Sequence, residues 1–304
     1  FLRKDCVAPD VTVVIPTYNR AEDLRRCLDS LVAQTYANFE VVVCDDGSTD
    51  ASEEVAAEFL GRLDIRYETA ENFGGPARPR NRGIRMARAH IVAFLDSDDW
   101  WAPEKLRLSV AALNEGADIV YHDLFVVRVQ SQTIFKDRVV SSKPRSPMFT
   151  ALLCTGISIP NSSVVVRKEL LEKIGGISEE RDLISVEDYD TWIRLSQLTD
   201  KFVRIPAVLG YYWVGGGNIS AASPRQIERI KVLYARHVNA LAQHIRPIAE
   251  GFLAYRIGRI AQMCGDSHTA QISLSRALRA PIGLLYRLKA ILFLAQSVVA
   301  RTSS

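Results

Sequence analysis

The chain has few cysteines, and their spacing excludes two structural roles. They are odd in number, widely separated and free of any C-x-x-C pair: Cys6, Cys27, Cys44, Cys154 and Cys264. A disulfide framework needs an organised, paired set, and a cysteine zinc site needs ligands at short spacing. Reduced thiols fit this pattern better, so we expect a cytoplasmic protein.

Several short signatures of catalysis and cofactor binding are also missing. The five histidines include no H-x-x-x-H pair, and neither G-x-S-x-G nor G-x-x-x-x-G-K occurs. The glycines at 215–217 follow no N-terminal strand–helix unit. These absences argue against a serine hydrolase, a P-loop protein and a dinucleotide-binding fingerprint. The histidines are expected to be structural or on the surface.

Charge is distributed unevenly along the 304 residues, whose net charge is +3. Residues 221–304 contain twelve Arg and Lys against three Asp and Glu, a net charge of +9, which leaves −6 for residues 1–220. With 48% hydrophobic and 24% charged residues, the composition is globular. We expect a catalytic domain over 1–220 and a basic helical region over 221–304.

Apolar, β-branched runs alternate with helical patterns in the first hundred residues. The runs predict strands at 11–16, 39–44, 64–69 and 90–95. The helical patterns occupy 21–34, 51–60, with Asp50 as the predicted N-cap, and 79–89. This alternation predicts an α/β fold with a mostly parallel sheet, which binds ligands at the carboxyl ends of its strands. The unusual residues of this chain lie at those ends.

Three carboxylates follow the fourth predicted strand in FLDSDDWW: Asp96, Asp98 and Asp99. Like charges this close raise one another's pKa, and a bound divalent cation offsets that repulsion. Oxygen ligands suit Mg²⁺ or Mn²⁺, which takes one or two carboxylates together with phosphate oxygens. The alternative is a solvated acidic turn before a helix that starts near Pro103, and the pattern leaves both open.

The second predicted strand ends in CDDGSTD, which contains Asp45 and Asp46. Gly47 permits a tight turn, and the next residues open a helix, so a carboxylate and free backbone N–H groups converge there. A carboxylate in this position suits the ring N–H of uracil. Turn and capping chemistry explains Ser48 and Asp50, but it does not explain Asp45 and Asp46 together.

Two further stretches carry charged residues at predicted helix starts. In NFGGPARPRNRG, Arg78, Arg80 and Arg82 lie around a Gly74-Gly75 pair and Pro79. They either bind a diphosphate or are ordinary surface arginines. In SVEDYDTWIRL, Glu187 and Asp188 begin a helix. They either complement its dipole or supply a general base that deprotonates an acceptor hydroxyl.

The motifs in this order resemble the family 2 glycosyltransferases of the GT-A fold. The resemblance covers roughly residues 11–220: VVIPTYNR, VVVCDDGSTD, NFGG with RNRG, FLDSDDWWAPEKL, IPNSSVVVRKELLEKIGG, VEDYDTWIRL and IPAVLGYYWVGGGNIS. It implies an inverting transfer from a nucleotide-diphosphate sugar, most often UDP-linked, to a saccharide or lipid-linked saccharide. The sequence departs from the family pattern at Tyr212-Trp213-Val214-Gly215, where the family often has Tyr-Arg-x-His.

The resemblance also implies site residues. The nucleotide sugar would be held by Pro16, Thr17, Tyr18, Arg20, Asp45, Asp46, Asn72, Gly75, Arg80, Asp96 and Ser97. Asp98 would bind Mn²⁺ or Mg²⁺, and Asp188 would be the base. A non-catalytic nucleotide-sugar-binding protein is an alternative. A Mg²⁺-dependent phosphohydrolase is another, but its acidic motif belongs on the first strand.

The basic region ends in PIGLLYRLKAILFLAQSVVA, residues 281–300. Arg287 and Lys289 inside this stretch argue against a spanning helix. An interfacial helix at the inner face of a membrane is compatible with them, and so is packing on the catalytic domain or another subunit. The excess of positive charge favours the membrane, which suits a lipid-linked acceptor. No nucleic-acid partner is expected.

Overall fold

The computed structural model describes residues 8–215 and 222–302, which form two compact units. The described part of the first unit comprises 8–144, 158–177 and 201–215. The described part of the second comprises 145–157, 178–200 and 222–302. The chain therefore changes unit several times, whereas charge had suggested a single boundary at residue 220. Residue 188, the predicted base, belongs to the second unit.

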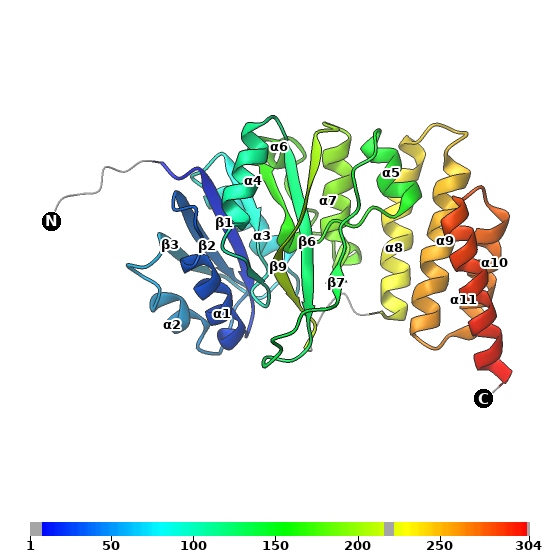
Figure 1. Cartoon of the computed structure of the whole chain (residues 1–304), viewed down its shortest axis with the longest axis horizontal. Coiled ribbons are helices and arrows are strands. Elements are labelled where there is room, and N and C mark those ends of the chain that lie inside the picture. Colours follow the sequence, from blue (N-terminus) through cyan, green and yellow to red (C-terminus); the bar gives the residue numbers. More distant parts are fainter. Residues whose placement is uncertain (1–7, 216–221, 303–304) are drawn as a thin grey trace. The chain divides into compact units, whose positions relative to one another are not determined.

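The first unit contains a mixed sheet, which has nine strands in the described part of the chain. Its parallel half has the order β3-β2-β1-β4 (Figure 1). These strands are β1 (Val11–Thr17), β2 (Phe39–Asp45), β3 (Ile65–Thr69) and β4 (Ile91–Phe94). Each coincides with a predicted strand, so the predicted α/β fold with a mostly parallel, mixed sheet is confirmed.

Beyond β4 the sheet continues with strands of both directions, in the order β8-β6-β9-β5, and β7 pairs with β6. Their bounds are β5 (Trp100–Trp101), β6 (Ile119–Val127), β7 (Arg138–Val139), β8 (Val165–Arg167) and β9 (Phe202–Trp213). β8 is antiparallel to β4 and β6, whereas β6 and β9 are parallel. Because β5 pairs with β9, Trp100, which directly follows the acidic cluster, lies opposite Tyr211.

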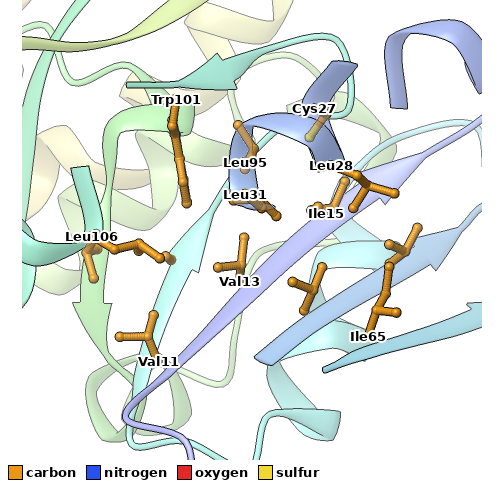
Figure 2. Packing of buried hydrophobic residues seen from close by; sticks show 14 of the residues in the cluster. Val11, Val13, Ile15, Cys27, Leu28, Leu31, Ile65, Leu95, Trp101 and Leu106 are labelled. Atoms are coloured by element: carbon orange, nitrogen blue, oxygen red, sulfur yellow. The ribbon is translucent and has the colours of Figure 1, made fainter. Parts of the chain in front are cut away.

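Helices cover both faces of the parallel strands. Alternate β1 residues, beginning at Val11, pack with α1 (Ala21–Val32), α2 (Ser52–Ala57) and α4 (Lys105–Asn114) in one core (Figure 2). The other face is covered by α3 (Ala77–Met86), where a Cβ on Gly83 would lie 2.4 Å from Val14 Cγ1. Glycine is therefore required at that contact. Two short helices flank β8 in sequence, η1 (Asn161–Ser163) and α6 (Lys168–Lys173).

The second unit is helical in its described part. It contains α5 (Met148–Thr155), η2 (Arg181–Leu183), α7 (Glu187–Ser196), α8 (Pro224–His237), η3 (Val238–Ala240), α9 (Arg246–Met263), α10 (Ser267–Arg279) and α11 (Leu284–Thr302). α10 packs against both α9 and α11 (Figure 1). Across the residues that the structure describes, no helix combines the length and apolarity needed to cross a membrane.

Two helix starts differ from the sequence expectation. α3 begins at Ala77, so Pro79 is its third residue instead of its first. α2 begins at Ser52, and its N-cap is Ala51. Asp50 instead accepts hydrogen bonds from the Ser52 N–H (3.1 Å) and hydroxyl (2.6 Å) and also from the Ala21 N–H (2.9 Å). It therefore links the starts of two helices.

Candidate active site

The loops after β1, β2 and β4 emerge at one edge of the sheet, because these three strands are parallel neighbours. The Asp46 N–H donates to the Thr17 carbonyl (2.9 Å). Asn19 connects the same two loops, since its N–H donates to Ser48 Oγ (2.8 Å) and its Oδ1 accepts from the Thr49 N–H (2.7 Å). The first and second loops thus form one connected surface.

Four further predicted donor-site residues lie at this edge of the sheet. Pro16 and Thr17 are buried at the end of β1, and Tyr18 follows them with 49% of its surface exposed. Ser97 is buried in the loop after β4. Their contact with a nucleotide sugar stays a prediction, and Tyr18 is the member of this group that is accessible to solvent.

Asp45 uses its carboxylate within the protein. It is 2% exposed and accepts hydrogen bonds from the Ser48 N–H and hydroxyl and from Thr69 Oγ1 (2.9 Å). A carboxylate has about four acceptor positions, so these donors occupy most of them. Turn chemistry therefore explains Asp45, which the sequence pattern had not accounted for. The proposed contact with a nucleobase stays a prediction.

Asp46 shapes the loop at 72–75. Its carboxylate accepts hydrogen bonds from the N–H groups of Phe73 and Gly74, both at 3.0 Å. Its carbonyl accepts from Asn72 Nδ2 (2.8 Å). Gly74 has φ = +85°, a conformation that favours glycine. The predicted donor-site residues Asn72 and Gly75 thus lie in a loop whose conformation depends on Asp46.

The arginines of α3 connect the second loop to the acidic loop. Arg80, which is 4% exposed, forms an ion pair with Asp96 (Nη2 to Oδ1, 2.6 Å). Arg82 donates from Nη2 to the Asp45 carbonyl. Arg78 is exposed. Its guanidinium lies 3.9 Å from the centroid of the Phe73 ring. All three of these arginines therefore contact the protein, and Arg80 and Arg82 position the loops around the site.

The side chains of the acidic loop after β4, residues 95–99, contact arginines and an amide. Asp96 Oδ1 accepts from Arg80 and from Asn161 Nδ2 (3.0 Å). Arg20, just before α1, lies 3.2 Å from Asp98 Oδ2. The side chains of Asp96 and Asp98 keep 29% and 19% of their surface exposed. The structure thus brings four predicted site residues together and leaves both carboxylates accessible.

Burial and repulsion raise the pKa values of the last two carboxylates in this loop. For Asp98, burial and then the charge of Asp96 raise the pKa to about 6, although Arg20 opposes them. Asp99 is 1% exposed, and burial together with the charge of Asp98 raises its pKa well above the ordinary value. Asp99 also accepts from the Trp213 N–H (2.9 Å). Burial and mutual repulsion thus disfavour the charged forms of Asp98 and Asp99.

This donor set fits a divalent cation with few protein ligands. Over residues 8–215 and 222–302, no three His, Cys, Asp or Glu side chains cluster so as to hold a metal ion. Mg²⁺ and Mn²⁺ commonly use one or two carboxylates and complete their coordination with phosphate oxygens. Asp96 and Asp98 supply such carboxylates, and a cation would offset the repulsion from Asp96 that adds to burial in raising the pKa of Asp98. The chemistry of the acidic loop therefore suits a metal that arrives with a diphosphate.

The sequence analysis missed Arg26, which is in none of the quoted motifs. Its guanidinium lies between two indoles, 4.3 Å from the Trp100 ring centroid and 5.0 Å from that of Trp213. Its Nη2 donates to the Asp98 carbonyl (2.9 Å) and to Asp23 Oδ1 (2.8 Å). The tertiary structure thus brings a guanidinium of α1 to Trp213, next to the acidic loop.

The predicted base, Asp188, lies in the first turn of α7 in the second unit. Its side chain is partly exposed, and its Oδ1 accepts from the Tyr189 N–H (2.7 Å). Glu187, the other acid considered there, is 4% exposed. Ser185, which precedes the helix, has φ = +72°, an uncommon conformation for a residue with a side chain. Asp188 is thus the more accessible acid, and its role as a base stays a prediction.

Asp190, two positions further along the same helix turn, is a structural ion-pair residue. It is fully buried and lies 2.7 Å from both His237 Nε2 and Arg194 Nε. Burial alone would raise its pKa, but the hydrogen bond with His237 and the charge of Arg194 bring the pKa below its ordinary value. Its charge is therefore matched inside the second unit, which leaves it poorly suited to accept a proton.

Solved structures share this fold. S. aureus TarS 1-349 in complex with UDP-GlcNAc superposes with a TM-score of 0.65 at 19% identity, covering 97% of this chain and 92% of that chain. The mannosyltransferase PcManGT from Pyrobaculum calidifontis, in complex with GDP-Man and Mn²⁺, gives 0.62 at 23% identity, covering 97% and 83%. At sequence identities of 19% and 23%, structural similarity shows a shared fold and nothing more. It confirms the expected GT-A architecture.

Sequence comparison identifies the family. The model of glycosyl transferase family 2 matches residues 12–175, more than half of the chain. The amylovoran biosynthesis glycosyltransferase AmsB of Erwinia amylovora is 31% identical over 278 residues, 87% of this chain and 89% of that protein. An uncharacterized glycosyltransferase of Nostoc sp. is 30% identical over 232 residues, 73% and 70%. The chain belongs to glycosyl transferase family 2.

Proposed function

We propose that this chain is an inverting, metal-dependent glycosyltransferase. It moves a hexose from a nucleotide-diphosphate sugar to a hydroxyl group of a saccharide or lipid-linked saccharide. The observation that carries the proposal is the acidic loop of a family 2 member, at the carboxyl edge of parallel strands. Its Asp96 and Asp98 are accessible, and Asp96 adds to burial in raising the pKa of Asp98, a repulsion that a bound cation would offset.

A UDP-linked sugar is the favoured donor, and a dTDP-linked sugar is the second choice because thymine presents the same ring N–H. The ligands of two TarS complexes, UDP and UDP-GlcNAc, support this preference. PcManGT was solved with GDP-Man, so GDP-linked sugars belong in any binding test. Asp45, at the end of β2, is the proposed partner of the uracil ring N–H. Its carboxylate would accept this hydrogen bond in addition to those from Ser48 and Thr69.

Mn²⁺ or Mg²⁺ is the proposed cofactor, with Asp98 as its protein ligand and Asp96 beside it. When bound, the metal would stabilise the negative charge that develops on the departing diphosphate. Arg20 and Arg80 hold the two carboxylates in position, and Arg26 fixes the loop through the Asp98 carbonyl. The Mn²⁺ in the PcManGT complex supports the choice of metal.

Asp188 is the proposed general base. Its carboxylate takes the proton of the acceptor hydroxyl while the hydroxyl oxygen attacks the anomeric carbon, and the bond from that carbon to the diphosphate breaks. A single displacement of this kind inverts the anomeric configuration. Among the acids at the start of α7, Asp190 is engaged in ion pairs and Glu187 is enclosed, which supports assigning the base to Asp188.

The proposed transfer belongs to polysaccharide or glycoconjugate synthesis. The support is the name of AmsB, an amylovoran biosynthesis glycosyltransferase that aligns with most of this chain. A saccharide acceptor fits this role, and its identity is a matter for acceptor screening.

Calorimetry tests the donor and the metal together. UDP, GDP and CMP are titrated into the protein with Mn²⁺ and with EDTA, and a thermal-shift screen of nucleotide sugars follows. UDP binding that Mn²⁺ tightens is the expected result. Binding to GDP or CMP without binding to UDP would overturn the donor assignment, and full transfer activity in EDTA would overturn the metal. NMR of the product tests inversion, because retention would exclude a single displacement.

A further inference from the structure

Helix α11 presents an exposed apolar face. Its members recur at helical spacing and are between 49% and 73% exposed: Leu284, Leu285, Leu288, Ile291, Leu292 and Val298. Positions 284, 288, 291 and 298 line up along one side of a helix of 3.6 residues per turn, and 285 and 292 lie beside them. Monomeric proteins seldom leave a contiguous apolar surface of this kind without a partner.

The opposite face of α11 is packed inside the second unit, which fixes the rotation of the helix. Ala290 and Ser297 are buried there. The Tyr286 hydroxyl donates to the Thr155 carbonyl (2.8 Å), and Gln271 Nε2 donates to the Ser297 carbonyl (3.0 Å). Because these contacts fix one side of the helix, the apolar face on the other side points outward. Its exposure therefore follows from how α11 packs and does not result from a helix that lacks packing contacts.

Cations border the apolar face on both sides. Arg287 follows Leu284 by three residues, and Lys289 follows Leu285 by four, so each is a helix neighbour of the face it borders. Both side chains are exposed. No Asp or Glu occurs from residue 267 to residue 304. The surrounding charge is thus of one sign.

We infer that the α11 face docks on an anionic lipid bilayer, with the helix lying in the interface. Leu and Ile side chains would enter the boundary between headgroups and acyl chains, while Arg287 and Lys289 would reach the anionic headgroups. A second copy of the chain is a less suitable occupant, because two such faces bring cations together without an acid from α10 or α11 to pair with them. The inference concerns membrane contact and does not depend on the proposed sugar transfer.

Vesicle sedimentation tests this inference with the full chain. The probes are phosphatidylcholine vesicles with and without phosphatidylglycerol, at low and high salt. The wild type is expected to pellet with the anionic vesicles at low salt. Leu288→Ser with Ile291→Ser should lower the bound fraction about tenfold or more. Arg287→Gln with Lys289→Gln should abolish the preference for anionic vesicles.

The matched control changes two exposed apolar residues of the first unit, Leu60→Ser with Ile134→Ser, which are 65% and 70% exposed. This variant should pellet like the wild type, and melting curves should show that all variants are folded. Absence of wild-type pelleting, or equal pelleting of the Leu288/Ile291 variant, would overturn the inference. Concentration-dependent dimers that this variant abolishes, without vesicle binding, would assign the face to a second copy instead.

Discussion

Asp98 in the first unit and Asp190 in the second are carboxylates of similar sequence context, since each follows a second acid by two residues. Asp190 is fully buried, yet its pKa lies below the ordinary value because His237 and Arg194 outweigh burial. Asp98 keeps some exposure, yet burial and Asp96 raise its pKa to about 6. Partners, more than depth, decide how well each charge is tolerated.

This difference separates two uses of a carboxylate. The second unit surrounds Asp190 with matching charge, so its ionised form stabilises the fold. In the first unit, burial and the charge of Asp96 disfavour the ionised form of Asp98, which costs stability at neutral pH. Asp123, which the same unit pairs with Arg204 (2.7 Å) and whose pKa is lowered by its partners against the effect of burial, resembles Asp190.

The largest expected effect is on activity. Asp98→Ala should reduce transfer by on the order of 10³-fold, because loss of the proposed metal ligand removes several kcal/mol of stabilisation of the leaving diphosphate. UDP binding should lose its dependence on Mn²⁺ while the melting temperature is unchanged or higher. Initial rates and calorimetry measure both effects. The exposed Asp29→Ala serves as the control, and wild-type transfer by the Asp98 variant would contradict the assignment.

The second effect is on stability. Asp190→Ala should lower the free energy of unfolding by about 3–5 kcal/mol, since it leaves the buried His237 and the partly buried Arg194 without their carboxylate. Urea denaturation measures the change. Glu228→Ala removes an exposed pair with Lys231 in the same unit and should change stability by less than about 1 kcal/mol. Equal losses in the two variants would contradict the claim that Asp190 stabilises the fold through its buried ion pairs.

The third effect concerns Asp188, the partly exposed acid near Asp190, and tests its proposed role as the general base. Asp188→Asn should reduce transfer by on the order of 10²-fold, the usual scale of general-base contributions, while donor affinity is retained. Single-turnover rates and UDP calorimetry separate the two quantities. Transfer at the wild-type rate would move the role to Glu187, and loss of donor binding would indicate a structural function instead.

The smallest effect is on the pH dependence of folding stability, to which Asp190 and Asp98 contribute with opposite sign. Asp190 has a lowered folded pKa, so its stabilisation is present above the unfolded pKa of about 3.9 and is lost as pH falls through the folded value. Asp98 has a raised folded pKa of about 6, so it disfavours folding at neutral pH, and that penalty disappears as pH falls from about 6 towards 4.

Asp98→Asn should therefore stabilise the chain at pH 7 by on the order of 1 kcal/mol, with no advantage near pH 4. Thermal melts across this range, without added metal, measure the difference. A constant difference between the variant and the wild type at every pH would show that the Asp98 carboxylate does not titrate in this way.

Local sequence patterns predicted the strands and helices around the site well. The β-branched runs at 11–16 and 39–44 became β1 and β2, because an apolar run of that length is stable only when both faces are buried. Helix starts were predicted less well. Pro79 is compatible with any position in the first turn, and therefore it did not identify Ala77 as the start of α3.

The residues available at the carboxyl edge of the sheet follow from the sequence alone. Chain order and strand periodicity place Asp45, Asp96 and Asp98 at strand ends, whatever the details of packing. The contacts that each of them makes depend on the tertiary structure. Asp45 meets Thr69, Asp96 meets Arg80, and the acidic loop meets Arg26 across distances in sequence that no local pattern spans. The physical reason is that desolvation and ion pairing depend on neighbours brought by folding, and these terms set whether a carboxylate is satisfied or left to bind a ligand.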